Sequence, residues 1–250
     1  MPGDKKIITV IPSRFASTRL PGKALLDIHG KPMIWWVAQR VAKSQVQDFL
    51  VATDDERIET VCRENEIPCL MTSKECVNGT ERVAEVSRQI SADYYINVQG
   101  DEPLVSISAI NTMYSYLLNN ENKGFVQAVA PLKANQEKDE SVVKLLLSDS
   151  SNVTSLCRLT NPDPNNRDLV TRNYFRCMGL YAYSGEFCRK YSETRPGELE
   201  RTQQIEQLRC LENVGMPITG VLVEDEGVSV DTFRDYEEVR SLPLELFISM

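Results

Sequence analysis

Several features that define common classes of protein are missing from this 250-residue chain. It has a single histidine, His29, which lies in the stretch DIHGKP and which we interpret as a turn residue. One histidine in a turn argues against a His-based catalytic triad and against a histidine metal site. The seven cysteines are odd in number and include no CxxC pair. We therefore interpret them as free core thiols in a reducing, cytoplasmic compartment.

Long apolar runs are also missing. None approaches the roughly 20 residues that a membrane-spanning helix requires, and charge together with Pro12 interrupts the first apolar stretch, so it does not resemble a signal peptide. An excess of positive charge is missing too, because 36 acidic residues outnumber 28 basic ones and the formal net charge is −8. We therefore expect no membrane and no nucleic acid as partners, since both favour a broad basic face.

The chain is acidic overall, yet its basic residues gather near the N-terminus. Five of them precede residue 26 against one acid, Asp4, and they are Lys5, Lys6, Arg14, Arg19 and Lys23. The loop IPSRFASTRLPGKAL (Ile11–Leu25) contains no acidic residue at all. A local cluster of this kind can bind an anionic substrate on an acidic protein.

Strand and helix patterns alternate over the first half of the chain. Short apolar runs predict strands, and amphipathic runs between them predict helices. The predicted strands are Lys6–Ile11, Phe49–Thr53, Ile67–Met71 and Tyr94–Gln99. The predicted helices lie at 31–44, with Pro32 at the first helical position, at 54–65, with an aspartate cap, and at 80–90. This alternation predicts βαβ units, an α/β fold and a mostly parallel sheet.

The pattern changes after about Gly124, where strand-like runs follow one another with few helices between them. These runs lie at 125–132, 141–148 and 176–184, and a turn-rich loop is predicted at Asn161–Asp168. An amphipathic helix is predicted from Glu200 to Gly215, and GVSVDTFRDYEEV predicts a strand that leads into a final helix. We expect a single domain over 1–250 with an inserted β-rich lobe at roughly 125–185.

The basic loop after the first strand suits a nucleoside triphosphate. Turn N–H groups can bind phosphate oxygens, and Gly22 permits the backbone conformations of a tight phosphate loop. Lys23 and the two arginines would stabilise the charge of departing pyrophosphate. The loop is neither a Walker P-loop nor a GxGxxG. The alternative is a solvated basic turn at the end of the sheet.

Two aspartates follow predicted strands. Asp101 lies in NVQGDEP and Asp231 in GVSVDT. Ligands of parallel sheets bind beyond the carboxyl ends of the strands, where two carboxylates could hold Mg²⁺ against phosphates. The alternative for Asp101 is a turn or capping residue, and for Asp231 it is the N-cap of the following helix.

The stretch NGTER (Asn78–Arg82) predicts a turn that opens a helix whose N-terminus could contact a nucleotide. The alternative is a plain helix cap in which Thr80 supplies the side-chain oxygen.

Seven segments together resemble the 3-deoxy-D-manno-octulosonate (Kdo) cytidylyltransferases, or CMP-Kdo synthetases. In chain order they are IPSRFASTRLPGKALLDIHGKPMI, VATDDERI, NGTERVAEV, YINVQGDEP, MGLYAY, IEQLR and GVSVDT. The resemblance covers nearly the whole chain. It implies a Rossmann-like nucleotidyltransferase fold and a typically dimeric enzyme, with the β-rich lobe contributing to the interface. In the implied reaction, the anomeric hydroxyl of an acidic keto sugar attacks the α-phosphate of CTP, so that CMP-sugar forms and pyrophosphate leaves.

The resemblance also implies roles for individual residues. The implied catalytic residues are Arg14, Lys23, Asp101 and Asp231, with the two aspartates as magnesium ligands. The implied nucleotide-binding residues are Arg14, Lys23, Asn78, Gly79, Arg82 and Gln99. The implied sugar-binding residues are Arg158, Cys177, Tyr181, Glu206 and Gln207.

Departures from the family pattern occur mainly on the sugar side. This chain has CRLTNPD where the family usually reads SRxxIPY-like, so Cys157 replaces a serine and the aromatic residue is lost. Cys177 stands where the family usually has a histidine before its GxYxY segment. CVNGT replaces the usual His-x-Ser-Gly-Thr. Three interpretations follow: an enzyme that uses Kdo, an enzyme for a modified Kdo or a nonulosonic acid, and an inactive nucleotide-binding homologue. Intact Lys23, Asp101 and Asp231 argue against the last of these.

Overall fold

The structure is a computed structural model that describes residues 5–17, 19–159, 174–224 and 227–248. At its centre lies β1 (Ile7–Ser13), all seven residues of which are buried. It pairs in parallel with β4 (Asp48–Thr53) and β6 (Tyr94–Val98). A strand covered on both faces favours a continuous β-branched run, which is what this segment offers. The predicted strand is therefore confirmed.

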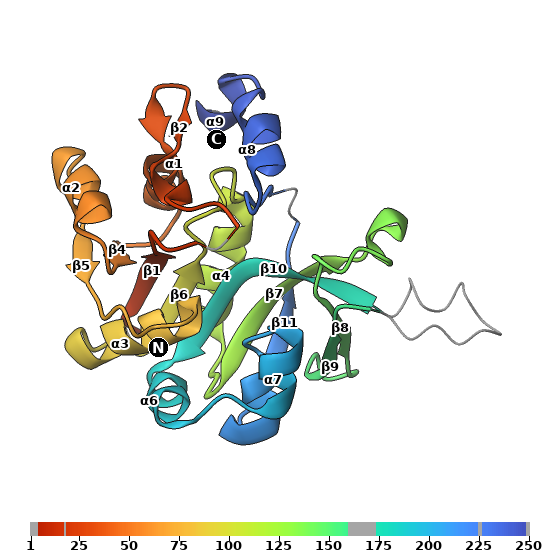
Figure 1. Cartoon of the computed structure of the whole chain (residues 1–250). Coiled ribbons are helices and arrows are strands. Elements are labelled where there is room, and N and C mark those ends of the chain that lie inside the picture. Colours follow the sequence, from red (N-terminus) through yellow and green to blue (C-terminus); the bar gives the residue numbers. More distant parts are fainter. Residues whose placement is uncertain (1–4, 18, 160–173, 225–226, 249–250) are drawn as a thin grey trace.

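Nine strands of the described residues form one sheet (Figure 1), whose main path has the order β11-β7-β10-β6-β1-β4-β5. Four of the six pairings along this path are parallel, and β10 is antiparallel to both of its neighbours. The remaining strands of the path are β5 (Cys69–Met71), β7 (Phe125–Pro131), β10 (Tyr174–Ser184) and β11 (Ile218–Leu222). The α/β fold with a mostly parallel central sheet is confirmed.

Helices cover both faces of this sheet. One apolar cluster joins it to α1 (Met33–Ala42), α2 (Glu56–Glu64) and α4 (Ile107–Asn119). A second cluster, on the other face, joins it to α3 (Gly79–Gln89) and α6 (Gly185–Glu193). The layers are therefore helix, sheet and helix, which leaves the carboxyl ends of the parallel strands at one open edge.

The strands at 125–184 are only partly an insertion. β7 and the second half of β10 belong to the central sheet, whereas β8 (Lys144–Leu147) and β9 (Val153–Cys157) extend it through the first half of β10. Figure 1 shows this extension beside α7 (Glu198–Gln203). A short helix, η2 (Ala134–Gln136), lies between β7 and β8. The predicted loop at Asn161–Asp168 lies outside the described residues.

A third apolar cluster joins the two ends of the chain. It packs α8 (Phe233–Arg240) and α9 (Glu245–Ile248) against α1 and β2 (Asp27–Ile28), and it includes Leu20 and Leu26 on either side of η1 (Lys23–Leu25). β2 forms a hairpin with β3 (Lys31–Pro32). Tyr236 Oη donates to the carbonyl of Asp27 at 2.7 Å, and Trp36 Nε1 donates to that of Ile28 at 2.7 Å. His29 lies in the β2–β3 turn with φ 50°, as predicted. C-terminal residues therefore reach the first loop.

The helix predicted at Glu200–Gly215 is wrong as a continuous element. α7 ends at Gln203, Gln204 takes a left-handed conformation (φ 53°, ψ 48°), and a π-helical turn, η3 (Cys210–Val214), follows before Gly215. The amphipathic pattern does not reveal the break, because tertiary contacts of the residues on either side stabilise it.

Other differences are smaller. Residues 227–230 form no strand before α8, which is followed by α9 and is therefore not the final helix. α1 begins at Met33, one residue after Pro32. The sequence patterns did not reveal α4, α6, β9 or β11. No described helix has the length and apolar character needed to span a membrane.

Candidate active site at the carboxyl edge of the sheet

The loop after β1 folds into a tight turn around Phe15. The N–H groups of Ser17 and Gly22 both donate to the carbonyl of Phe15 at 2.9 Å. Gly22 has φ 70°, and a Cβ at this position would lie 2.9 Å from the Phe15 ring. Glycine is therefore required here by both conformation and space, as the sequence predicted. The turn starts η1 and so fixes the position of Lys23.

Lys23 brings together the two predicted aspartates. Its Nζ donates to an Asp101 carboxylate oxygen in a short contact, to Asp231 Oδ1 at 3.3 Å and to the carbonyl of Val230 at 3.2 Å. The Lys23 side chain is 15% exposed and that of Asp101 is 20% exposed. Ion pairs are worth more at such partly buried positions than on the open surface. The two carboxylates therefore converge, which the sequence could only suggest.

Asp231 reaches this place from the C-terminal part of the chain. The N–H of the preceding residue, Val230, donates to the carbonyl of Asp101 at 2.9 Å, and Val230 is fully buried in the third apolar cluster. The alternative that Asp231 caps α8 is wrong: Thr232 is the N-cap, in a capping box with Asp235. The carboxylate of Asp231 is thus free of a capping role.

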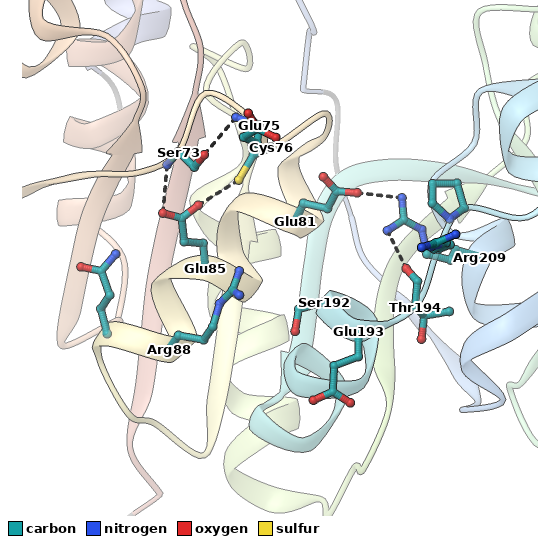
Figure 2. Close-up of a pocket in the computed structure, with 13 residues that line it drawn as sticks. Ser73, Glu75, Cys76, Glu81, Glu85, Arg88, Ser192, Glu193, Thr194 and Arg209 are labelled. Carbon is teal, nitrogen blue, oxygen red and sulfur yellow. Dashed lines mark hydrogen bonds and ion pairs between the residues drawn. The ribbon is translucent and has the colours of Figure 1, made fainter.

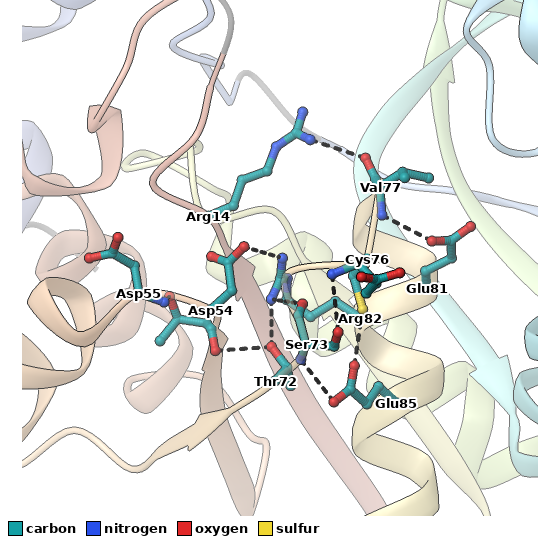
Figure 3. Close-up of polar contacts among 12 residues, drawn as sticks. Arg14, Asp54, Asp55, Thr72, Ser73, Cys76, Val77, Glu81, Arg82 and Glu85 are labelled. Atoms are coloured by element: carbon teal, nitrogen blue, oxygen red, sulfur yellow. Dashed lines mark hydrogen bonds and ion pairs between the residues drawn. The ribbon is translucent and has the colours of Figure 1, made fainter.

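The two loop arginines are mostly exposed. Arg14 Nη1 donates to the carbonyl of Val77 at 3.1 Å, which links the first loop to the segment before α3 (Figure 3). Arg19 Nη2 contacts Asp231 Oδ1 at 2.9 Å, and its side chain is 59% exposed. Both guanidinium groups therefore lie around the same edge as Lys23, where an anion could meet them.

The N-terminus of α3 lies at this edge too. Asn78 is its N-cap, with Oδ1 accepting from the Glu81 N–H at 2.8 Å, so the alternative in which Thr80 caps the helix is wrong. A Cβ on Gly79 would lie 3.1 Å from Gln99 Nε2 and 3.4 Å from Pro12. The end of β1, the start of α3 and Gln99 are therefore in direct contact.

Arg82 lies beneath this edge rather than on it. It is only 2% exposed, and its guanidinium pairs with Asp54 Oδ2 at 3.2 Å and donates to Thr72 Oγ1 at 2.5 Å. Figure 3 shows how these contacts, and the Glu85 carboxylate that accepts from the Ser73 N–H at 2.9 Å, hold the loop that precedes α3. The structure thus ties Arg82 to the ends of β4 and β5. Contact with cytidine stays a prediction for this residue.

Three of the predicted sugar-side residues gather behind the start of α3. Glu206 Oε2 accepts from the Thr80 N–H at 3.2 Å, and burial raises the pKa of its carboxyl group. Gln207 Nε2 donates to Gln127 Oε1 at 3.0 Å. Burial, with the charge of Glu206, holds the pKa of the Tyr181 hydroxyl well above its usual value. These groups therefore form a polar, poorly hydrated wall.

The other two predicted sugar-side residues lie on β10 and just after β9. Cys177 pairs with Val129 on β7, and burial raises the pKa of its thiol, so the thiol stays protonated. Arg158 follows β9, and the side-chain hydrogen bonds that the structure describes for it all go to main-chain carbonyl groups. The structure therefore separates Arg158 from the Lys23 cluster, with no direct contact between them among the described interactions.

A buried polar network was not predicted. Tyr183 Oη lies 2.7 Å from Thr80 Oγ1 and accepts from Asn97 Nδ2 at 3.0 Å, and Asn78 Nδ2 donates to Tyr191 Oη at 3.2 Å. These tyrosines belong to runs that predict only strand or core packing. Their hydroxyls matter because β10 and α6 bring them to the start of α3, which is a tertiary effect.

Two hollows lie away from the Lys23 cluster. The larger, about 770 Å³, lies between α3 and α6 and is lined by charged residues that include Glu85, Arg88 and Arg209 (Figure 2). Arg209 is already paired there, with Glu81 and Glu200. The smaller, about 510 Å³, includes Cys157 and Arg158. The chemistry of Lys23, Asp101 and Asp231 instead points to the open edge of the sheet, where ligands of such folds bind.

Metal binding at this edge depends on two carboxylates. In the part of the chain that the structure describes, no three His, Cys, Asp or Glu side chains are grouped as a metal site. Mg²⁺ needs fewer protein ligands, because it binds through one or two carboxylates together with phosphates and water. Asp101 and Asp231 offer hard oxygen ligands that already converge on one cation, so the residues present fit this ion.

Comparison with known proteins gives one consistent family. The cytidylyltransferase family profile matches residues 8–218. A 3-deoxy-manno-octulosonate cytidylyltransferase of Acinetobacter baumannii is 36% identical over 248 residues, which cover 95% of this chain and 98% of that protein. One of Polynucleobacter asymbioticus is 36% identical over 242 residues, with 94% of each chain covered.

Solved structures agree with these sequences. A CMP:2-keto-3-deoxy-manno-octonic acid synthetase complexed with CTP superimposes with a TM-score of 0.86 at 33% identity, covering 94% of this chain and 97% of that one. A putative glucose-1-phosphate thymidylyltransferase from Bacillus anthracis has a TM-score of 0.66 at 12% identity and shares the fold alone.

Proposed function

We infer that this chain, which belongs to the 3-deoxy-manno-octulosonate cytidylyltransferase family, joins CTP to Kdo to give CMP-Kdo and pyrophosphate. The observation that carries this inference is the convergence of Lys23, Asp101 and Asp231 at the carboxyl edge of a nucleotidyltransferase sheet. The relatives support Kdo over the modified or nonulosonic sugars and over an inactive homologue.

The nucleotide would lie along the edge formed by the first loop and the start of α3. We propose that Arg14 and Lys23 bind the triphosphate, with Lys23 exchanging its carboxylate partners for phosphate oxygens as the substrate arrives. Asn78, Gly79 and Gln99 would lie beside the cytidine, where a Cβ at position 79 would crowd the side chain of Gln99. The partly buried edge strengthens each charge interaction with the departing pyrophosphate.

Asp101 and Asp231 would hold magnesium. When bound, this ion would neutralise phosphate charge during the transfer. The two aspartates reach the edge from β6 and from the segment before α8, so their separation depends on how the C-terminal helices pack.

The sugar would be placed by Tyr181, Glu206 and Gln207, with Cys177 and Arg158 completing the predicted set. A protonated Cys177 is a weak hydrogen-bond donor, so the neighbouring hydroxyl and amide groups would carry most of the recognition. We also propose that the protein acts in the cytoplasm as a homodimer. The seven unpaired cysteines support a reducing compartment.

Pyrophosphate release with CTP and magnesium across a panel of acidic keto sugars tests this function. We expect Kdo to give the highest kcat/KM and sugar-free controls to give no release. A nonulosonic acid or amino analogue that exceeds Kdo would assign the enzyme to that sugar instead, and Cys177→His would then be expected to shift preference toward Kdo. Absence of release with every sugar, from a folded protein that binds CTP, would favour the inactive homologue.

A further inference from the structure

Each of the three side-chain nitrogens of Arg158 donates a hydrogen bond to the protein backbone. Its Nε donates to the carbonyl of Gln203 at 2.7 Å, its Nη2 to that of Gln204 at 2.9 Å, and its Nη1 to that of Glu140 at 2.9 Å. A guanidinium offers its donors in a fixed, planar fork, and here three of its nitrogens are used. Arg158 thus connects the end of β9 to the end of α7 and to Glu140, and we call these three hydrogen bonds the Arg158 brace.

The brace lies on the C-terminal end of α7. The last carbonyl groups of a helix lack intrahelical partners and favour a nearby cation, and Arg158 supplies both a donor pair and a charge to two of them. Gln204, which ends the helix, is left-handed, a conformation that is unfavourable for a residue with a side chain. Arg158 therefore offsets the cost of the turn that replaces the predicted continuous helix.

The turn sets the direction of the predicted sugar-side residues. Immediately after it, Ile205 is buried, Glu206 reaches the N–H of Thr80 at 3.2 Å, and Gln207 reaches Gln127 at 3.0 Å. Had α7 continued as a regular helix, these side chains would follow the 100° rotation per residue of α7 itself. The position of Glu206 and Gln207 thus depends on the turn at Gln204.

Arg158 is held in turn by a buried lysine. Lys144 on β8 has no exposed surface, and its Nζ donates to the carbonyl groups of Arg158 and Asp139. Burial lowers the pKa of Lys144. Burying an ammonium group costs free energy unless its N–H groups donate hydrogen bonds. The two bonds of Lys144 therefore indicate that it fixes the main chain at Arg158.

We propose that Arg158 and Lys144 are positioning residues for the sugar site: they act through the turn at Gln204, which places Glu206 and Gln207. The expected effect on sugar binding rests on the proposed function. Its structural part concerns the protein without substrate and is tested separately.

Hydrogen–deuterium exchange of the substrate-free protein tests the structural part. In Arg158→Gln we expect about tenfold faster exchange at the amides of Gln204, Leu208, Arg209 and Cys210, whose hydrogen bonds close the turn. Lys144→Met should accelerate exchange at the same amides. Arg158→Lys, which keeps the charge but loses the fork, should give an intermediate rate and serves if Arg158→Gln does not fold. Arg201→Gln, on the exposed face of α7, is the matched control and should match the wild type.

Kinetics test the catalytic part. In Arg158→Gln the KM for the keto sugar should rise about tenfold while the KM for CTP stays near the wild-type value. Adding Glu206→Gln to Arg158→Gln should raise the sugar KM little further, because both substitutions disturb the same group of contacts at the turn. Unchanged exchange at the four amides combined with a raised sugar KM would overturn the proposal, since Arg158 would then act on sugar binding without affecting the turn. A protein that shows the exchange effect yet transfers CMP to no sugar would instead refute the proposed function alone.

Discussion

At the scale of single residues, Lys23 has the clearest position for catalysis, between two carboxylates and beside the first loop. Lys23→Ala should lower kcat by at least 10²-fold, because one well-placed charge on a departing anion is worth about 3 kcal/mol or more. The fold should persist with a loss of roughly 1 kcal/mol, since the lysine is only partly buried. Steady-state kinetics and thermal melting measure both effects.

Lys190→Ala is the matched control for this variant. Its ammonium forms an exposed pair with Glu186 on α6, which is the one ion pair of Lys190 among the described residues. Activity and melting temperature should stay near wild type. A wild-type kcat in Lys23→Ala would remove this residue from the reaction.

Asp231 should act in metal binding and not in helix capping. We expect Asp231→Asn to raise the magnesium concentration needed for half-maximal activity at least tenfold, because an amide is a poor ligand for this hard cation. Asp101→Asn should do the same, and the double variant should lose much less than the sum of both effects. Magnesium titrations of activity, at saturating CTP, give these values.

Thr232→Ala separates the two roles of this segment. Removing the N-cap of α8 should cost about 1 kcal/mol of stability and leave the magnesium requirement unchanged. If Asp231→Asn keeps the normal magnesium dependence, its carboxylate serves only to pair with Lys23 and Arg19.

At the scale of elements, the contact between the start of α3 and the turn after α7 predicts a pH dependence. The pKa of Glu206 is raised above its ordinary value of 4.5, so the folded state binds more protons than the unfolded state above pH 4.5. The contribution of Glu206 is therefore most favourable at low pH and is lost as the pH rises through the folded pKa. Glu206→Gln keeps an acceptor for the Thr80 N–H and removes the charge.

The melting temperature of Glu206→Gln, relative to wild type, should therefore increase between pH 4.5 and pH 8. Differential scanning fluorimetry at several pH values measures this difference. Glu245→Gln changes an exposed carboxylate in α9 and should show no such trend. A constant difference across the range would mean that burial does not perturb Glu206 in the folded protein.

At the scale of the whole molecule, the third apolar cluster couples the chain ends to the site. Phe247 on α9 is 3% exposed, and its ring lies 5.1 Å from that of Trp36. Phe247→Ala should lower stability by about 3 kcal/mol. It should also raise the magnesium requirement, because the same cluster buries Val230 beside Asp231. Ile248→Ala, at a side chain that is largely exposed, should change neither property.

The order of β1, β4, β5 and β6 and of the three helices between them followed from the sequence, because buried parallel strands and amphipathic helices impose distinct periodicities on the residues. The same reasoning placed Lys23 and Asp101 near one another: the carboxyl ends of parallel strands meet at one edge whatever the details of packing. Gly22 was predictable too, since its turn needs a left-handed backbone. The family resemblance, spread over seven segments, was likewise present in the sequence.

Only the tertiary structure decided the rest. Asp231 lies 208 positions after Lys23, and no local pattern indicates that α8 and α9 return it to the first loop. The break at Gln204 goes against the amphipathic pattern, because contacts such as those of Arg158 outweigh helix propensities of less than about 1 kcal/mol per residue. Arg82 and Arg14 look equivalent in the sequence, yet one is buried against Asp54 and the other faces solvent. Local periodicity encodes elements, whereas burial and charge pairing arise only when distant segments meet.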